Sequence, residues 1–216
     1  GFLIVDNNTT GYYKDLFDKL SKDQNIEVNW VNIKIDKTIY LRRNSLFKKA
    51  VSFLNSKILY FISCLEKKRS QYNYNNHFLE SVQISEFDIG LTLKSTLKIP
   101  SNRLTLCNDE IIKFQSCNFD LAIRASFGIL DSTFFNVCKK GIISLHLGDN
   151  RKIRGSMPGF YESLFKHDEI GFIIQKINDK LDGGDILYRA NYPAKSRWND
   201  NHLFIIGLSF EPYYNT

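Results

Sequence analysis

Short apolar runs that alternate with helical patterns constrain the fold of this chain most. The first run, Phe2–Val5, is continuous and ends at a polar turn, and a helical pattern over Tyr12–Leu20 follows it. The same alternation continues into the C-terminal part of the chain. Strands that alternate with helices are typical of an α/β domain, so we expect a mainly parallel central sheet flanked by helices.

The pattern of apolar residues also predicts where the remaining elements lie. Further strands are expected at Ile26–Ile35, Ser85–Leu93, Leu121–Arg124, Ile142–His146, Ile170–Ile177 and Ile186–Tyr192. Further helices are expected at Asn44–Lys68, Asn108–Phe114, Thr133–Lys139 and Asn201–Ser209, and a mobile loop at Ser70–His77. Residues 1–200 should form one domain. Residues 201–216 should form a helix or tail, from which a domain absent from this chain could continue.

The composition is that of an ordinary globular protein and excludes a disordered one. The chain has 216 residues, 43% of them hydrophobic and 24% charged, with a net charge of +6. This positive charge is diffuse, so we expect no nucleic-acid partner. Its densest clusters, Arg42–Arg43 and Lys67–Arg69, flank an apolar stripe over Val51–Leu65. A packed helix with solvated basic ends explains that stripe, and a helix on a membrane surface is the alternative.

The cysteines and the apolar runs define the expected environment. The four cysteines show no closely spaced pair and no neighbouring histidine cluster, so we expect free thiols and no metal site. Free thiols are typical of a reducing compartment. No run reaches the roughly 18 apolar residues that a membrane-spanning helix needs. We therefore expect a soluble, cytoplasmic protein.

A histidine closes one of the predicted buried strands. His146 follows Gly141–Leu145, and a polar loop comes directly after it. Open α/β sheets bind ligands at the carboxyl ends of their strands, which is where His146 falls. Downstream, Leu181–Asp185 places glycines beside a carboxylate, so backbone and side chain can both approach a ligand closely. Each feature alone is more often structural, as a buried histidine or a turn.

In their order and spacing, these motifs resemble the folate-dependent formyltransferase family. That family has Asn-x-His, then a Ser-Leu-Leu-Pro loop, then Arg-Gly-x-x-Pro, and further on a Leu-Asp-x-Gly motif. Here His146 matches the histidine, and Arg154, Gly155 and Pro158 keep the spacing of the third motif. Leu181–Asp185 is similar to the last motif. The resemblance implies a Rossmann-like formyltransferase domain that uses 10-formyltetrahydrofolate as co-substrate.

The resemblance also implies the site residues. An amine that attacks a formyl carbon creates a negatively charged oxygen, which needs a hydrogen-bond donor, and a carboxylate beside the histidine helps to remove the amine's proton. The implied catalytic positions are His146 and Asp182, with Ser144 and Asn150 as further candidates. The implied cofactor-binding residues belong to the segment that walls the folate pocket and to the aspartate motif: Arg124, Phe127, Gly128, Ile129, Leu130, Gly183 and Asp185.

Two departures from the family pattern bear on activity. The family asparagine falls on Ser144, and the Ser-Leu-Leu-Pro loop is replaced by Gly148–Arg151. The Ser144 hydroxyl can donate to the oxyanion if it reaches, and Asn150 can supply the missing amide if its loop folds inward. The competing hypothesis is a catalytically degenerate module that binds a ligand or partner.

The expected acceptor is a small-molecule amine, most simply that of a nucleotide-linked or glycan amino sugar used in glycan biosynthesis. The family's glycinamide-ribotide enzymes have a glycine-rich phosphate loop after the first strand, where this chain has Asp6–Thr10. Methionyl-tRNA formyltransferases carry an additional RNA-binding domain, which we do not expect here. A tRNA-acting enzyme is therefore the third hypothesis.

Overall fold

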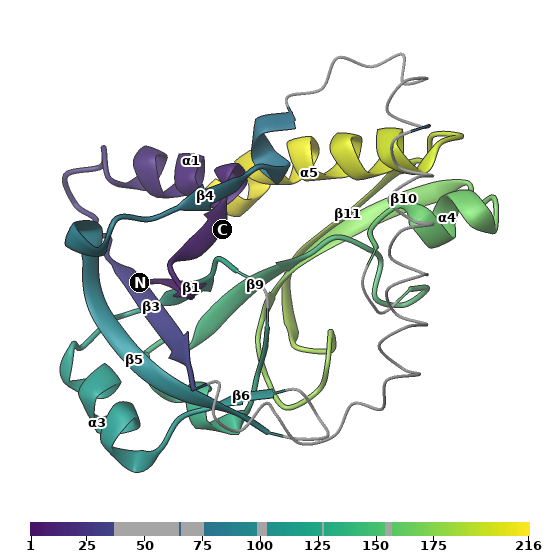
Figure 1. Cartoon of the computed structure of the whole chain (residues 1–216). Coiled ribbons are helices and arrows are strands. Elements are labelled where there is room, and N and C mark those ends of the chain that lie inside the picture. The colour runs from purple at the N-terminus through teal and green to yellow at the C-terminus, as the bar shows by residue number, and fades with distance from the viewer. Residues whose placement is uncertain (37–64, 66–75, 99–102, 127, 154–156) are drawn as a thin grey trace.

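One twisted sheet with helices on both faces organises the molecule (Figure 1). The structure is a computed structural model that describes residues 1–36, 65, 76–98, 103–126, 128–153 and 157–216. Within this part the sheet has 11 strands, and its main path follows the order β11-β10-β9-β7-β1-β3-β5-β6-β8. The expected α/β architecture is confirmed.

The element bounds are as follows. The strands are β1 Phe2–Val5, β2 Asn8–Thr10, β3 Trp30–Ile35, β4 Ser81–Gln83, β5 Ile89–Lys98, β6 Arg103–Thr105, β7 Ala122–Arg124, β8 Ile129–Leu130, β9 Ile142–His146, β10 Glu169–Lys176 and β11 Asp185–Pro193. The α-helices are α1 Gly11–Leu20, α3 Asn108–Ser116, α4 Phe160–Leu164 and α5 Trp198–Asn215. Three short 3-10 helices cover Asn76–Leu79, Glu86–Asp88 and Ser132–Phe134.

The centre of the sheet is parallel and one border is antiparallel. Strand β1 pairs in parallel with β3 and β7, and the parallel pairing continues to β5 on one side and to β9 on the other. Strand β10 then pairs antiparallel with both β9 and β11. Parallel strands end at a common edge, so the residues after β1, β7 and β9 lie along one border of the sheet.

Two hydrophobic cores lie on opposite faces of the sheet, because successive side chains of a strand point to opposite sides. On β1, Phe2 and Ile4 belong to one core, with Leu16 of α1 and Ile205 of α5. Leu3 belongs to the other core, which includes Phe114 of α3. Figure 1 shows α1 and α5 along one face and α3 on the other.

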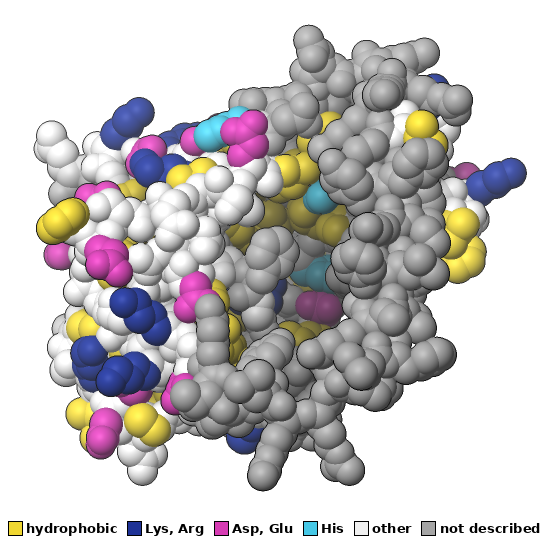
Figure 2. All heavy atoms as spheres, in the orientation of Figure 1, with side chains coloured by type: hydrophobic (Ala, Val, Ile, Leu, Met, Phe, Trp, Pro, Cys, Tyr) yellow, Lys and Arg dark blue, Asp and Glu magenta, His cyan; other side chains and the backbone are white. Residues whose placement is uncertain are grey.

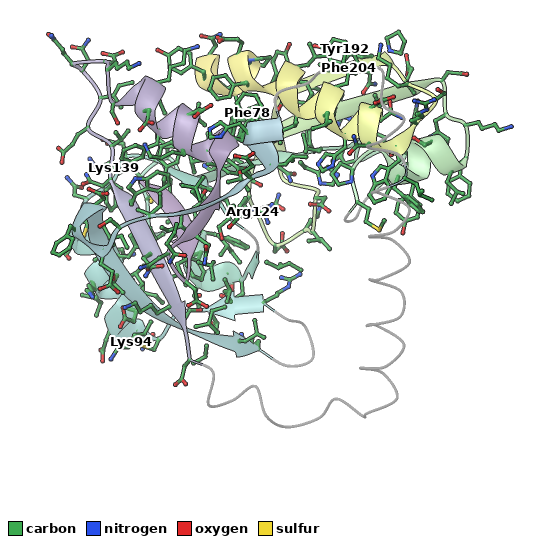
Figure 3. The ribbon with its side chains drawn as sticks, turned by 45° about the horizontal axis from the view of Figure 1, so that its top comes forward. Phe78, Lys94, Arg124, Lys139, Tyr192 and Phe204 are labelled. Atoms are coloured by element: carbon green, nitrogen blue, oxygen red, sulfur yellow. The ribbon has the colours of Figure 1, made fainter. Side chains whose placement is uncertain are left out.

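An aromatic cluster joins α1 and α5 across the first core. Phe78, from the 3-10 turn before β4, stacks on Phe210 of α5 with ring centroids 5.2 Å apart (Figure 3). Tyr12 of α1 meets both rings edge-on and shares a hydrogen bond with Ser209. Residues 201–216 are therefore part of the packed helix α5, while the division into two regions at residue 200 stays a prediction.

Several predicted elements are confirmed, and three are corrected. The strand expected at Ile26–Ile35 begins only at Trp30, which pairs with Phe2 at the start of β1. The helix expected at Thr133–Lys139 is a short 3-10 turn, in which the Asp131 carboxylate accepts the Thr133 backbone N–H. The strand expected at Ser85–Leu93 begins at Ile89, after another 3-10 turn.

Some expectations fall outside the described residues. They include the helix at Asn44–Lys68 with its basic flanks, of which only Leu65 is described, and most of the loop at Ser70–His77. Phe127, Arg154 and Gly155 also lie outside. In the ranges that are described, Cys107, Cys117 and Cys138 are free thiols. None of the described helices has the length and hydrophobicity needed to cross a membrane.

Close packing of β10 on β11 gives a stability prediction. A Cβ on Gly171 would lie 2.6 Å from the Ala190 carbonyl oxygen, so Gly171→Ala should lower the free energy of unfolding by about 2 kcal/mol. Gly207, in α5, has no atom within 4 Å of the same added carbon. Gly207→Ala should instead raise stability by about 0.5–1 kcal/mol. Urea unfolding of both variants measures the difference, and equal effects would contradict the packing argument.

Candidate active site

His146 and Asp182 come together at the carboxyl edge of the sheet. His146 ends β9, and Asp182 lies in the connection between β10 and β11. The Oδ1 atom of Asp182 is 3.5 Å from Nδ1 of His146, and the side chains are 15% and 9% exposed. A carboxylate at this distance orients the imidazole ring. The structure thus brings together the two residues that the family resemblance singles out.

The backbone of Asp182 is strained and is held in place by Asn150. Asp182 has φ of +49°, a left-handed conformation that is uncommon for residues other than glycine. Its carbonyl oxygen accepts a hydrogen bond of 2.7 Å from Nδ2 of Asn150. The Asn150 side chain therefore positions the backbone of Asp182.

A buried carboxylate, Asp149, anchors the loop that carries Asn150. Arg151 donates to Asp149 from Nε at 2.9 Å and from Nη2 at 2.6 Å, and Arg189 of β11 pairs with it from the other side. Arg189 also donates to Oδ1 of Asn150 at 2.8 Å, and Asn191 donates to Asp149 at 3.2 Å. The hydrogen bonds from Arg151 hold the pKa of Asp149 well below its usual value. We call Asp149, Asn150, Arg151 and Arg189 the loop clamp.

The second ring nitrogen of His146 is buried without a partner. Nε2 makes no hydrogen bond with any described residue. A Cβ at position 148 would lie 3.1 Å from this nitrogen, so Gly148 leaves room beside it. Buried polar atoms are normally satisfied, and an unsatisfied one next to an oriented histidine indicates a place where a ligand or water binds.

Asp182 lines a cavity at the same edge of the sheet, whereas His146 is not among its lining residues. The cavity has an empty volume of about 400 Å³ including its open mouth. Its lining combines apolar side chains of β8 and of the β10–β11 connection with polar and charged groups from β6, β7, β9, β10 and the same connection: Arg103, Arg124, Ile129, Leu130, Ser144, Gln175, Ile177, Asn178, Asp179, Lys180, Leu181, Asp182 and Gly184. Apolar walls with a few convergent polar groups are typical of small-molecule sites.

The molecular surface agrees with this location. Figure 2 shows a hollow with hydrophobic walls, in which histidine and acidic side chains are visible. Arg124, which is labelled in Figure 3, ends β7 and is half-buried. In the described ranges, no three His, Cys, Asp or Glu side chains are grouped so that they could hold a metal ion.

The predicted cofactor-binding residues divide into two groups. Arg124, Ile129 and Leu130 line the cavity, and Nη1 of Arg124 donates to the Gly128 carbonyl at 3.0 Å. Gly183 and Asp185 flank the lining residue Gly184 without lining the cavity themselves. Asp185 begins β11 and is exposed. Its role as a binding residue stays a prediction.

Three further residues escaped the sequence reasoning. Gln175 is a buried amide in the apolar strand β10. Its position directly after the apolar residues of this strand is the sequence feature that could have identified it. Arg189 belongs to the loop clamp, and only the alternation of an edge strand hinted that it faces inward. Glu162 gave no signal, because it lies in the short helix α4, which the pattern did not predict.

Glu162 is a buried carboxyl close to the histidines. The residue is 4% exposed, and its Oε2 makes no hydrogen bond to the described residues. Burial raises its pKa, while the nearby rings of His167 and His146 act in the opposite direction. Glu162 thus adds a second acidic group to the surroundings of His146.

Sequence comparison relates part of this chain to formyltransferases. A methionyl-tRNA formyltransferase from Listeria innocua is 30% identical over 98 residues, which is 45% of this chain and 31% of the relative. The chain therefore matches about a third of the length of the curated relatives. No model of a protein family matches it.

Structural comparison extends the similarity to the whole chain. A glycinamide ribonucleotide transformylase from Symbiobacterium toebii superposes with a TM-score of 0.57 over 99% of this chain and 84% of its own, at 12% identity. A sugar N-formyltransferase from a Shewanella species gives 0.51 over 99% and 68%, at 14% identity. The fold is that of the formyltransferase domain, and the family resemblance found in the motifs is confirmed.

The loop clamp gives a stability prediction with a pH dependence. The folded-state pKa of Asp149 lies below the ordinary value of 3.8, so its stabilisation is present above that pH and is lost as the pH falls below it. Asp149→Asn should lower the free energy of unfolding at pH 7 by about 3 kcal/mol, since it leaves Arg189 without its charge partner. The loss should shrink in acid. Guanidinium unfolding between pH 3 and pH 7 measures both effects.

Asp120 provides the matched control for this substitution. Its carboxylate pairs with Lys139 at 2.9 Å, but both side chains are more than half exposed. Asp120→Asn should therefore change stability far less than Asp149→Asn. A cost for Asp149→Asn no larger than for Asp120→Asn would show that the loop clamp does not stabilise the fold.

Proposed function

We propose that this protein is an N-formyltransferase, which moves the formyl group of 10-formyltetrahydrofolate to an amine. The observation that carries the proposal is the approach of Asp182 to His146 beside a lined cavity, with Nε2 of the histidine unpartnered. A buried ring nitrogen that no described residue satisfies is available to a bound ligand. The similarity to formyltransferases in sequence and fold supports the same proposal.

The residues at the site suit the chemistry of formyl transfer. When the amine nitrogen bonds to the formyl carbon, the formyl oxygen gains negative charge and the amine must lose a proton. His146 is placed to donate a hydrogen bond from Nε2 to that oxygen, and Asp182, 3.5 Å from Nδ1, orients the ring that does so. The proton leaves the amine and reaches the folate nitrogen as its bond to the formyl carbon breaks.

The cavity is suited to a flat heterocycle such as the pterin of a folate. Ile129 and Leu130 offer apolar contact, while the backbone of the segment from Arg124 to Leu130 can meet polar edges. The Leu181–Gly184 connection borders the same space. Folate bound there would bring its formyl group next to residues of both β9 and the β10–β11 connection.

For the acceptor we propose an amino sugar, free or nucleotide-linked. After β1 the chain turns back into β2, and α1 begins only at Gly11. A phosphate cradle at a helix N-terminus directly after the first strand is therefore not formed by these residues. Asp6 also places a carboxylate at that edge. Both features disfavour a ribotide phosphate at this position and leave a hydroxyl-rich acceptor as the better fit.

A second candidate is a degenerate formyltransferase-like module that binds its ligand without turnover. Ser144 supports it, because a hydroxyl stands where the resembling family has an amide. Its Oγ donates to the Leu145 carbonyl at 3.3 Å, which leaves it poorly placed to act as an oxyanion donor.

Folate binding is the first test. Titration calorimetry with 5-formyltetrahydrofolate, a stable relative of the co-substrate, should show one binding site per chain. Leu130→Arg places a bulky charge on the apolar wall and should weaken binding at least about 10-fold. An exposed leucine, Leu164, is the control, and Leu164→Arg should leave affinity unchanged. No binding at millimolar ligand would refute the proposed function.

Catalysis is the second test. His146→Ala and Asp182→Ala should each reduce formyl transfer by about 10² to 10³-fold, and the double variant should be little worse, since both groups serve one transition state. Asp18→Ala, on the exposed face of α1, should keep full activity. The assay supplies 10-formyltetrahydrofolate with a panel of free and nucleotide-linked amino sugars and detects products by mass. Folate binding with no product from any amine would favour the degenerate module.

A further inference from the structure

Gln175 lies directly across the sheet from Ser144. The antiparallel register of β10 and β9 pairs these two residues, and directly paired side chains project to the same face with Cβ atoms about 5 Å apart. Both residues line the cavity beside Asp182. A side chain at position 175 therefore reaches the space that a longer side chain at position 144 would occupy.

The amide of Gln175 is oriented by one hydrogen bond. Its Oε1 accepts the backbone N–H of Gly184 at 3.0 Å, which ties the amide to the connection that carries Asp182. The residue is 5% exposed, and its Nε2 makes no hydrogen bond within the described part of the chain. One end of the amide is thus fixed, and the other retains donor capacity at the cavity.

The other amides of the site are engaged elsewhere. Asn150 donates to the Asp182 carbonyl and accepts from Arg189. Asn178 donates to the Gly183 carbonyl at 3.4 Å, and its Oδ1 accepts the Lys180 backbone N–H. Of the amides at the site, Gln175 is therefore the one best placed to donate toward a ligand beside Ser144.

We propose that Gln175 is a catalytic residue, whose Nε2 donates to the formyl oxygen and replaces, from the neighbouring strand, the amide that position 144 lacks. The proposal rests on the proposed function, because it concerns the oxyanion of the same transfer. Removal of one oxyanion donor typically costs 10² to 10³-fold in rate. That loss is the size of effect to be measured.

The test uses a reaction that needs no identified acceptor. In the hydrolysis of 10-formyltetrahydrofolate, water bonds to the formyl carbon, the bond from that carbon to the folate nitrogen breaks, and the nitrogen takes the proton. Formate and tetrahydrofolate result, and the same oxyanion forms as in transfer to an amine. Gln175→Glu keeps an acceptor for the Gly184 N–H and removes the donor, and Gln175→Met removes the donor without adding charge.

A rescue variant and a control make the test specific. Ser144→Asn restores an amide on β9, so it should recover at least about 10-fold of the rate that Gln175→Glu loses. Gln115→Glu makes the same chemical change on the exposed surface of α3 and should keep the rate of the wild type. Circular dichroism of each variant verifies folding.

A spectroscopic readout is independent of turnover. Isotope-edited infrared spectra of bound 10-formyl-5,8-dideazafolate, carrying ¹³C in the formyl group, report hydrogen bonding to the formyl oxygen. We expect a lower carbonyl stretching frequency in the wild type than in either Gln175 variant, and a hydrolysis rate at least about 10²-fold lower in the variants.

The outcomes distinguish failure of the Gln175 proposal from failure of the proposed function. If the folded variants bind the analogue and keep both the frequency and the rate of the wild type, the role of Gln175 is refuted and the proposed function stands. If the wild type binds the analogue but does not hydrolyse the folate, the infrared measurement alone tests the role of Gln175. A lower carbonyl stretching frequency in the wild type than in the variants then supports this role, and equal frequencies refute it. If the wild type binds no folate at millimolar concentration, both proposals fail.

Discussion

The contact between Asp149 and Arg189 is the interaction on which the candidate site depends. Asp149 follows β9 and Arg189 lies on β11, so this ion pair spans the intervening strand β10. Arg189 holds Asn150 at the same time, and Asn150 holds the backbone of Asp182. A buried carboxylate with several charge-assisted hydrogen bonds is strongly ordered. The distance from Asp182 to His146 is therefore set by a chain of contacts that begins outside the cavity.

The sequence was sufficient for the central strands and for the pairing of His146 with Asp182. Strands rich in apolar residues, such as Ile142–His146, are buried on both faces, and the hydrophobic pattern identifies them. His146 and Asp182 followed from motif order. The loop clamp did not follow, because the pairing of Arg189 with Asp149 depends on strand order, and a register between distant strands is not encoded in local pattern.

Local pattern also failed where side chains compete with the backbone. The stretch after Asp131 has a helical pattern, but the Asp131 carboxylate binds the Thr133 backbone N–H and favours a short turn. Asn150 is a related case. From the sequence it was a candidate amide donor in the reaction, and the structure shows its amide in contact with the Asp182 backbone. The spacing of motifs in the sequence identifies residues near a site. The structure is needed to distinguish a residue that can donate a hydrogen bond to the ligand from one that positions the backbone.

Asp182 lies in the connection between two antiparallel strands, β10 and the edge strand β11, and this position has a consequence for folding kinetics. β10 and β11 are close in sequence, and their mutual contacts need only a short loop to close. His146 instead ends β9, whose other neighbour, β7, is part of the interior parallel sheet. The pair thus bridges a locally formed hairpin and an interior assembled from distant segments. Amide hydrogen exchange of the 177–184 connection would report the docking of that hairpin on β9, so the candidate site also marks one step in the assembly of the sheet.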